Sequence, residues 1–205
     1  MSLRERGFAA IYDRLVAPSE EAFLRARRND LVGAAAGVVL EIGGGTGANL
    51  PHYRKASRVV VTEPSAAMRA KLGAKLDEAA APVTVAAAGA EAVPYPDGFF
   101  DTVVTTLVLC TVDDLDASLA EIRRVLKPGG ELRFLEHVRG AGREAEWQDR
   151  LQPVWTWLAV GCYPNRDTEG AIRDAGFTID EIERFVAPGP PTPVRPLIQG
   201  LARRP

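Results

Sequence analysis

The stretch VVLEIGGGTG at residues 38–47 decides the fold of this chain. Residues 38–42 are a short run rich in β-branched side chains, which is typical of a strand buried on both faces of a parallel sheet. The glycines that end the run permit a tight turn and a close approach of backbone to ligand. The helix start that follows offers free amide donors, so the sequence predicts a polar ligand at this turn.

Strands and helices alternate outward from this turn. Because parallel crossovers need a covering helix, the alternation predicts an open α/β sheet with helices on both faces. Further strands are expected at residues 58–62, 83–87, 99–106 and 131–138, with helices at residues 65–78 and 113–126.

The two ends of the chain depart from this alternation. Two helices are expected before the first strand, the second beginning after Pro18 with Ser19 as its N-cap. At the other end, strand-like runs at residues 177–186 and 194–202 are joined by the proline-rich segment 187–193, which is poorly suited to a helix. These two strands are expected to pair as an antiparallel hairpin at one edge, which makes seven strands in all.

Composition narrows the class of protein. The 205 residues suit one domain, and 46% apolar with 25% charged residues is a globular composition. No stretch approaches the roughly 18 to 20 apolar residues of a membrane span. With 25 Lys plus Arg against 27 Asp plus Glu, the net charge of −2 gives no long-range field to attract nucleic acid. We therefore expect a small-molecule partner, no nucleic acid and no integral membrane segment.

The two cysteines, Cys110 and Cys162, are far apart in the sequence. They show no Cys-x-x-Cys or Cys/His spacing, so the sequence predicts neither a disulfide framework nor a metal site. The first fourteen residues are interspersed with charges and show no apolar core of a secretory signal. A reduced, cytoplasmic setting is expected.

Glu41 bears on which ligand the glycine turn prefers. The pattern Gly43-x-Gly45-x-x-Ala48 formally satisfies the dinucleotide fingerprint, which on its own is weak evidence for a nicotinamide-dependent oxidoreductase. A carboxylate two residues before the first glycine repels a pyrophosphate and suits a ligand that carries an ammonium and a sulfonium group. The sequence therefore favours a sulfonium cofactor over a dinucleotide.

Two further segments are expected at the same ligand. Glu63 lies at the tip of the second strand, where a carboxylate can accept hydrogen bonds from both ribose hydroxyls of an adenosine. Ala90 and Glu91 follow the third strand, and their backbone groups are placed to meet an adenine edge, in a loop that its prolines hold rigid.

Several ordered motifs together resemble class I S-adenosylmethionine-dependent methyltransferases. They are EIGGGTG at residues 41–47, the acid at 63, GAEAVPYPDGFFD at 89–101 and TTLVLCTVDDLDASLAEIRRVLKPGGELRFLEHV at 105–138. The segments TLVLC, LEHV, GCYPNRDT at 161–168 and the final hairpin resemble the group that contains animal alkyl thiol methyltransferases, and the quinone-biosynthesis C-methyltransferases more distantly.

This resemblance implies a Rossmann-like, mostly parallel seven-stranded sheet in one domain, with lid helices at residues 1–35 and a catalytic core at 36–205. It implies S-adenosylmethionine as cofactor and S-adenosylhomocysteine as product. The cofactor-binding residues that it implies are Tyr12, Glu41, Gly43, Gly44, Gly45, Gly47, Glu63, Pro64, Ala90, Glu91, Thr106 and Leu107.

The leading activity is methylation of a small or lipophilic thiol by in-line transfer. The alternative within the class is C- or O-methylation of a quinone-like or phenolic molecule, which needs a general base. His137, at the carboxyl end of the fifth strand, is the candidate base. A cofactor-binding module without catalytic activity is the remaining possibility. The oligomeric state is left open.

Other residues near the predicted site are given plainer roles. Cys110 is interpreted as a pocket wall, and the tryptophans as core or pocket wall. Arg25, Arg27 and Arg28 are interpreted as a solvated helix face. Arg166 and Asp167 are expected either to line the acceptor pocket or to pair at a helix start.

Overall fold

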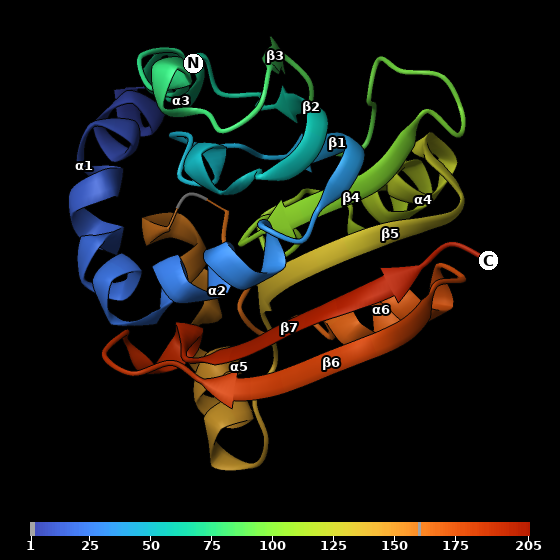
Figure 1. Ribbon diagram of the computed structural model, residues 1–205. Coiled ribbons are helices and arrows are strands. Elements are labelled where there is room, and N and C mark those ends of the chain that lie inside the picture. The colour runs from blue at the N-terminus through green and yellow to red at the C-terminus, as the bar shows by residue number, and fades with distance from the viewer. Residues whose placement is uncertain (1–2, 160) are drawn as a thin grey trace.

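The computed structural model describes residues 3–159 and 161–205. Its centre is a seven-stranded sheet with the order β3-β2-β1-β4-β5-β7-β6 (Figure 1). The strands are β1 (Ala36–Ile42), β2 (Lys55–Thr62), β3 (Val83–Ala86), β4 (Phe100–Thr106), β5 (Leu126–His137), β6 (Thr178–Val186) and β7 (Pro196–Arg203).

Strands β1 to β5 are parallel, and β7 runs antiparallel to both β5 and β6. This confirms the predicted fold, including the hairpin at one edge. The predicted boundaries of the first four strands differ from the observed ones by at most three residues. Strand β5 begins at Leu126, five residues earlier than expected.

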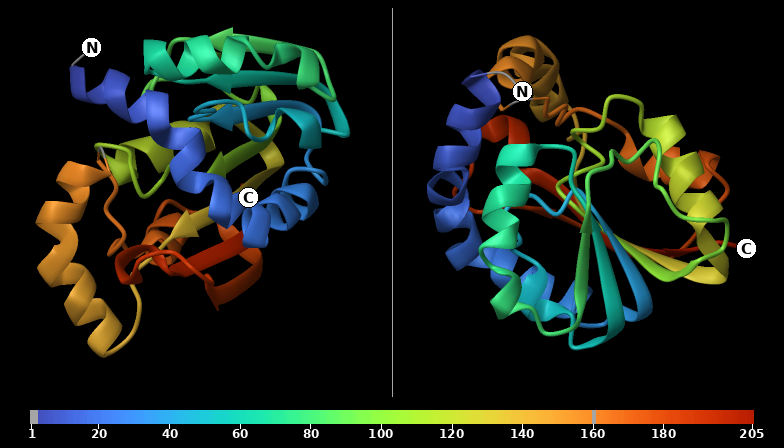
Figure 2. Two further views of the ribbon diagram at one scale, coloured as in Figure 1. Left: turned by 90° about the vertical axis from the view of Figure 1, so that its left-hand side faces the viewer. Right: turned by 90° about the horizontal axis from the view of Figure 1, so that it is seen from above.

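Helices cover both faces of the sheet (Figures 1 and 2). On one face lie α2 (Arg25–Leu31) and α3 (Ala66–Gly73), and on the other lie α4 (Leu115–Val125) and α6 (Thr168–Asp174), while α1 (Leu3–Ser19) crosses the carboxyl ends of the parallel strands. Helix α5 (Arg143–Leu158) projects beyond the sheet. No helix of residues 3–159 and 161–205 combines the length and apolarity required to cross a bilayer.

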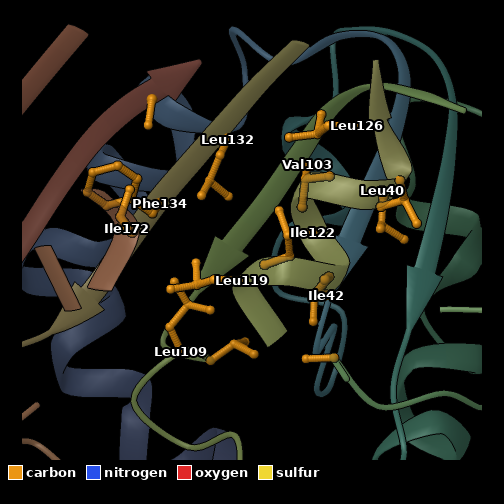
Figure 3. Packing of buried hydrophobic residues seen from close by; sticks show 14 of the residues in the cluster. Leu40, Ile42, Val103, Leu109, Leu119, Ile122, Leu126, Leu132, Phe134 and Ile172 are labelled. Carbon is orange, nitrogen blue, oxygen red and sulfur yellow. The ribbon is translucent and has the colours of Figure 1, made fainter. Parts of the chain in front are cut away.

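The core follows from the alternation of side chains along the buried strands. Leu40 and Val103 point to the face covered by α4, where they pack with Leu119 and Ile122 of that helix (Figure 3). Their neighbours Val39 and Val104 point to the opposite face and pack in a second cluster. Both faces are therefore apolar along each central strand, as expected for a parallel sheet with helices on both sides.

The predicted helix start at Ser19 is wrong. Ser19 has helical backbone angles and its side chain makes no capping hydrogen bond. Helix α1 instead continues through a π-helical segment, Glu20–Leu24, into α2, with the Arg25 amide donating to the Glu20 carbonyl. Pro18 lacks an amide donor, yet it lies inside α1 and does not end the helical run.

Candidate functional site

The glycine turn lies at the carboxyl end of β1, where the parallel strands end and α1 runs past them (Figure 1). Gly43, Gly45 and Gly47 have positive φ angles of 65°, 54° and 85°, which side chains other than glycine rarely adopt. At Gly44 a Cβ atom would lie 2.1 Å from the Val61 Cγ1 atom, so no other residue fits there. The turn is therefore close-packed at Gly44, and the amides of Gly44, Gly45 and Gly47 donate to groups of the protein itself. The helix start expected after the turn is wrong, because turns and the short 3-10 helix Leu50–His52 lead into β2.

Glu63 joins this turn to the start of α3. One carboxylate oxygen accepts from the Gly45 amide (2.9 Å) and the other from the Ser65 amide (2.8 Å). The residue is 7% exposed, and burial raises the pKa of its carboxyl. Each oxygen retains a second lone pair, so the group can still accept hydrogen bonds from a diol beside the turn.

Glu41 is held beneath the turn by the protein itself. The Asn49 amide donates to one of its oxygens and the Tyr53 hydroxyl to the other, each at 2.8 Å. This corrects the picture of an acid aimed at the ligand, because buried polar groups take internal partners when the fold supplies them. Glu41 therefore acts on a ligand at the turn only through the electrostatic field of a buried acid. Its hydrogen bonds to Asn49 and Tyr53 fix the segment 49–53.

Burial raises the pKa of Glu41 above its usual 4.5, against the hydrogen bonds of Tyr53 and Asn49. The folded protein therefore holds this proton at pH values where the unfolded chain has lost it, and the stability that Glu41 contributes falls as the pH rises above 4.5. A Glu41→Gln variant lacks this titration, and the Tyr53 hydroxyl can accept from its amide. We expect the variant to gain stability relative to wild type as the pH rises above 4.5. Urea unfolding of both proteins across that range measures the difference, and a constant difference would contradict it.

Arg28 links the N-terminal helices to the turn. It is 5% exposed and forms an ion pair with Glu20 (3.0 Å). Its Nη1 donates to Asn49 Oδ1 (2.8 Å) and to Thr106 Oγ1 (2.9 Å). The prediction of a solvated face is thus wrong for Arg28, while Arg27 beside it pairs with the exposed Glu183. The buried guanidinium is stabilised because the three side chains that it contacts accept its hydrogen bonds, and one of them is an anion.

Helix α1 closes over the glycine turn. The Thr46 hydroxyl donates to Asp13 Oδ1 (2.6 Å), and Lys71 and Lys75 pair with Asp13 at 3.4 and 3.6 Å. Burial raises the pKa of the Tyr12 hydroxyl, which also lies within the electrostatic reach of Arg28 and Cys110. Asp13 is therefore the contact between helix α1 and the glycine turn.

Replacing Asp13 with alanine is expected to loosen this helix without unfolding the core. The hydrogen bond and two partly exposed ion pairs are together worth about 0.5 to 1.5 kcal/mol. Amide hydrogen exchange of residues 8–16 is expected to speed up about 2- to 10-fold. The exposed Asp77 provides the control, and Asp77→Ala is expected to leave exchange unchanged. Equal exchange in wild type and Asp13→Ala would show that the helix is held elsewhere.

The loop after β3, which its prolines are predicted to hold rigid, is hydrogen-bonded to helix α4. The guanidinium of Arg124 donates to the Val93 and Tyr95 carbonyls, and Glu121 accepts from the Val93 amide. Ala90 is buried, and Glu91 accepts from the Asp114 amide at 3.4 Å. The Ala90–Glu91 backbone is thereby fixed on the β3 side of the edge.

The ends of β4 and β5 complete the edge. Leu107 has a φ angle of 61°, which is uncommon outside glycine and marks a sharp turn away from the strand. Beyond it, the buried Glu136 accepts from the amides of Val108 and Cys110 at 3.2 and 3.4 Å. Val108 in turn lies against the glycine turn, since a Cβ on Gly43 would be 2.6 Å from it.

Cys110, His137 and Cys162 meet at this end. The Nδ1 atom of His137 is 3.5 Å from the Cys110 sulfur and 3.8 Å from the Cys162 sulfur. Hydrogen bonds from Cys110 and His137 lower the pKa of Cys162 to about 5, while Cys162 and burial raise that of Cys110. The two cysteines, far apart in the sequence, are therefore neighbours in the fold. Their separations of 27 and 25 residues from His137 match no linear pattern, so only the fold reveals the group.

The segment that carries Cys162 is tied to the one that carries Cys110. The Tyr163 amide donates to the Cys110 carbonyl (2.7 Å), and Arg166 donates to the carbonyls of Leu109 and Val112 at 2.8 and 2.7 Å. Asp167 caps α6 through the Gly170 amide (2.9 Å). Arg166 and Asp167 thus have separate roles, and Arg166 positions the loop that follows β4.

The three tryptophans of α5 differ from one another in burial. Trp147 and Trp157 are 48% and 63% exposed, so neither belongs to the core. Trp155 is half-buried and packs against the cluster of Cys110, Cys162 and Val194. A helix that projects from the sheet has no second layer to cover its outer face, which explains why these large side chains remain exposed.

Comparison with known proteins now identifies the class. The methyltransferase domain family matches residues 40–134. Among solved structures, the putative methyltransferase of Haloferax volcanii bound to the activator Trm112 superposes with a TM-score of 0.74 at 19% identity, covering 98% of this chain and 97% of that one. The geranyl diphosphate C-methyltransferase of Streptomyces coelicolor, solved with S-adenosyl-L-homocysteine, gives 0.68 at 16% identity, covering 95% and 86%. The fold and the glycine turn define a class I S-adenosylmethionine-dependent methyltransferase.

Curated relatives narrow the family. Human thiol S-methyltransferase TMT1B is 38% identical over 178 residues, which cover 84% of this chain and 73% of the relative. Human TMT1A is 36% identical, over 80% of this chain and 69% of the relative. The chain belongs to the methyltransferase family that contains these enzymes. The ubiquinone/menaquinone biosynthesis C-methyltransferase UbiE of Bordetella avium is 33% identical over 130 residues, covering 62% and 48%.

Proposed function

We propose that this enzyme transfers the methyl group of S-adenosylmethionine to the sulfur of a small or lipophilic thiol. The observation that carries the proposal is the 38% identity to a thiol S-methyltransferase over 84% of the chain. It is supported by the carboxyl edge of the sheet, where the Glu63 carboxylate, the glycine turn and a sulfur-rich group follow one another at the ends of β2, β1 and β4–β5.

The order of the strands gives the cofactor its direction. Glu63 on β2 is proposed to accept from the ribose hydroxyls, and the Ala90–Glu91 backbone beyond β3 to meet the adenine. The amino-acid portion then lies over the glycine turn, and the sulfonium faces the ends of β4 and β5. Along this path we place Tyr12, Glu41, Gly43, Gly44, Gly45, Gly47, Pro64, Thr106 and Leu107.

The division of labour within the chain follows from this placement. We propose that residues 1–35 form the lid and residues 36–205 the catalytic core of one domain. Asp13 and Arg28 connect the lid to the turn, and a closed lid excludes water from the transfer. A thiolate in a dry site is a stronger nucleophile than one in water, because it loses its hydration shell.

Methyl transfer requires the protein mainly to position the acceptor and the cofactor. The cofactor supplies an electrophilic methyl carbon, and the protein holds the acceptor sulfur in line at about 3 to 3.5 Å. A thiol with a pKa near ~8.5 is a percent or more thiolate at neutral pH, so modest stabilisation of the anion suffices. His137 lies beside the sulfurs of Cys110 and Cys162 at this edge, and it is proposed as the catalytic residue nearest to the acceptor thiolate.

The test compares acceptors that differ in a single atom. With the enzyme and S-adenosylmethionine, release of S-adenosylhomocysteine is expected with a short alkyl thiol and not with the alcohol of the same chain length. The UbiE relatives motivate a quinol as the second acceptor. Turnover on the quinol with none on any thiol would contradict thiol methylation and support methylation of the quinol ring instead. Family membership decides against the nicotinamide-dependent alternative that the glycine fingerprint had left open.

A further inference from the structure

We propose that Cys110, His137 and Cys162 bind a zinc ion whose fourth coordination position faces the acceptor thiol. Among residues 3–159 and 161–205, these three side chains place their ligand atoms within 4.8 Å of one another. They come from the loop after β4, the end of β5 and the loop after α5. The claim that the fourth position receives the acceptor rests on the proposed thiol methylation, whereas the metal site itself does not.

The distances are those of a tetrahedral site. Zinc binds thiolate sulfur at about 2.3 Å and imidazole nitrogen at about 2.0 to 2.1 Å, so a sulfur and a nitrogen on one tetrahedral zinc lie about 3.6 Å apart. The observed separations from His137 Nδ1 are 3.5 and 3.8 Å. One ion can therefore contact both sulfurs and the ring nitrogen with little movement of the side chains.

The donor set also fits zinc. Two thiolates and one imidazole are soft and borderline ligands, which favour zinc over magnesium or calcium. Three protein ligands with one open position are the pattern of catalytic zinc sites, while structural sites are closed by four. Cys110 and Cys162 are buried and packed against Val194 and Trp155, which shields the ion from bulk water on that side.

The ligands are held in place by their surroundings. Glu136 accepts from the Cys110 amide, and the Cys110 carbonyl accepts from the Tyr163 amide, so both cysteine-bearing loops are fixed by backbone contacts. Arg166 secures the first loop at the Leu109 and Val112 carbonyls. Such outer contacts lower the cost of assembling a metal site, because the ligands are already placed.

A disulfide between Cys110 and Cys162 is the competing use of these sulfurs. It needs a sulfur–sulfur bond of about 2.05 Å and makes no use of an imidazole. The structure instead has both thiols free, with His137 Nδ1 at nearly equal distances from the two sulfurs. Hydrogen bonds among the three groups and a shared metal ion both fit that arrangement, and a disulfide leaves the position of His137 unexplained.

Zinc at this place accounts for the choice of a thiol. An acceptor RSH replaces the water on zinc, binds as RS⁻ and releases its proton to solvent. A lone pair of that sulfur then forms the new S–CH₃ bond, while the bond from the methyl carbon to the sulfonium breaks and leaves its electron pair on S-adenosylhomocysteine. The neutral thioether is a weaker ligand and gives way to water. The loop that carries Cys110 also contacts the turn, because Val108, two residues before Cys110, lies against Gly43.

Metal content tests the site without any acceptor. The full chain, reduced, loaded with zinc and desalted, is expected to retain about one zinc per chain by mass spectrometry of metals. His137→Ala and Cys162→Ser are expected to retain less than about a tenth of that, and His52→Ala, which changes the other histidine, to retain all of it. Circular dichroism establishes that each variant is folded. Absence of zinc in the wild type, equal zinc in the variants, or a mass two units lower from a Cys110–Cys162 disulfide would each overturn the proposal.

Cobalt(II) in place of zinc tests the wild-type protein alone, in case a variant does not fold. Thiolate-to-cobalt charge-transfer bands together with tetrahedral d–d bands are expected, and their absence overturns the site. Adding an alkyl thiol is expected to strengthen the charge-transfer bands, and an unchanged spectrum overturns the fourth-position assignment. Thiol turnover by a zinc-free enzyme would leave the proposed function standing and overturn the assignment of the fourth position to the acceptor.

Discussion

Glu63→Ala is expected to raise the Kd for S-adenosylmethionine roughly 10- to 150-fold. A charge-assisted pair of hydrogen bonds to a diol is worth about 1.5 to 3 kcal/mol, and alanine supplies neither of them. The substitution also removes the hydrogen bonds that the carboxylate accepts from the Gly45 and Ser65 amides, so the turn loses two of its contacts. Isothermal titration calorimetry with S-adenosylhomocysteine and S-adenosylmethionine measures both effects.

Two control variants separate recognition from support. Glu63→Gln keeps one acceptor oxygen and is expected to have an intermediate Kd. Glu78→Ala removes an exposed acid of the following helical segment and is expected to bind as wild type does. If Glu63→Ala binds the cofactor with unchanged affinity, the carboxylate does not contact the ribose and the proposed orientation of the cofactor is wrong.

Arg28→Ala is expected to lower the free energy of unfolding by about 3 to 5 kcal/mol, the range found when one member of a buried charge pair is removed. Glu20, Asn49 and Thr106 would each lose a buried partner. Because Thr106 belongs to β4 and Asn49 to the segment after the glycine turn, the loss is expected to reach the site as well as the helix.

The adjacent arginine is the matched control. Arg27 pairs with the exposed Glu183 and lies 4.1 Å from the ring centre of Phe185, so Arg27→Ala is expected to cost less than about 1 kcal/mol. Urea unfolding of the two variants gives the comparison directly. Similar losses for both would mean that the buried network around Arg28 does not stabilise the fold.

Much of the fold is predictable because local and global signals agree. The β-branched run at 38–42 and the glycines after it predict β1 and its turn, and the proline-rich connector predicts the C-terminal hairpin. The start of α2 is not predictable in the same way. Pro18 and Ser19 indicate a new helix locally. The helix instead continues past them through the π-helical segment Glu20–Leu24, which the packing of the N-terminal segment stabilises.

The site is less predictable than the fold, for a physical reason. Residues that end strands, such as Glu63 and His137, are found from the pattern of the strands alone. Arg28 reads as exposed because it lies in a basic run, and its burial depends on Thr106, 78 residues away. Cys110 and Cys162 meet only because two loops cross the end of β5. Long-range contacts of this kind leave no periodicity in the sequence.

A single competition experiment tests the central claim most directly. The enzyme is given S-adenosylmethionine with a deuterated methyl group and an equimolar mixture of an alkyl thiol and a quinol, and the products are identified by mass spectrometry. We predict that the deuterated methyl appears on sulfur, as the alkyl methyl thioether. Label found only on ring carbon or ring oxygen would contradict the account.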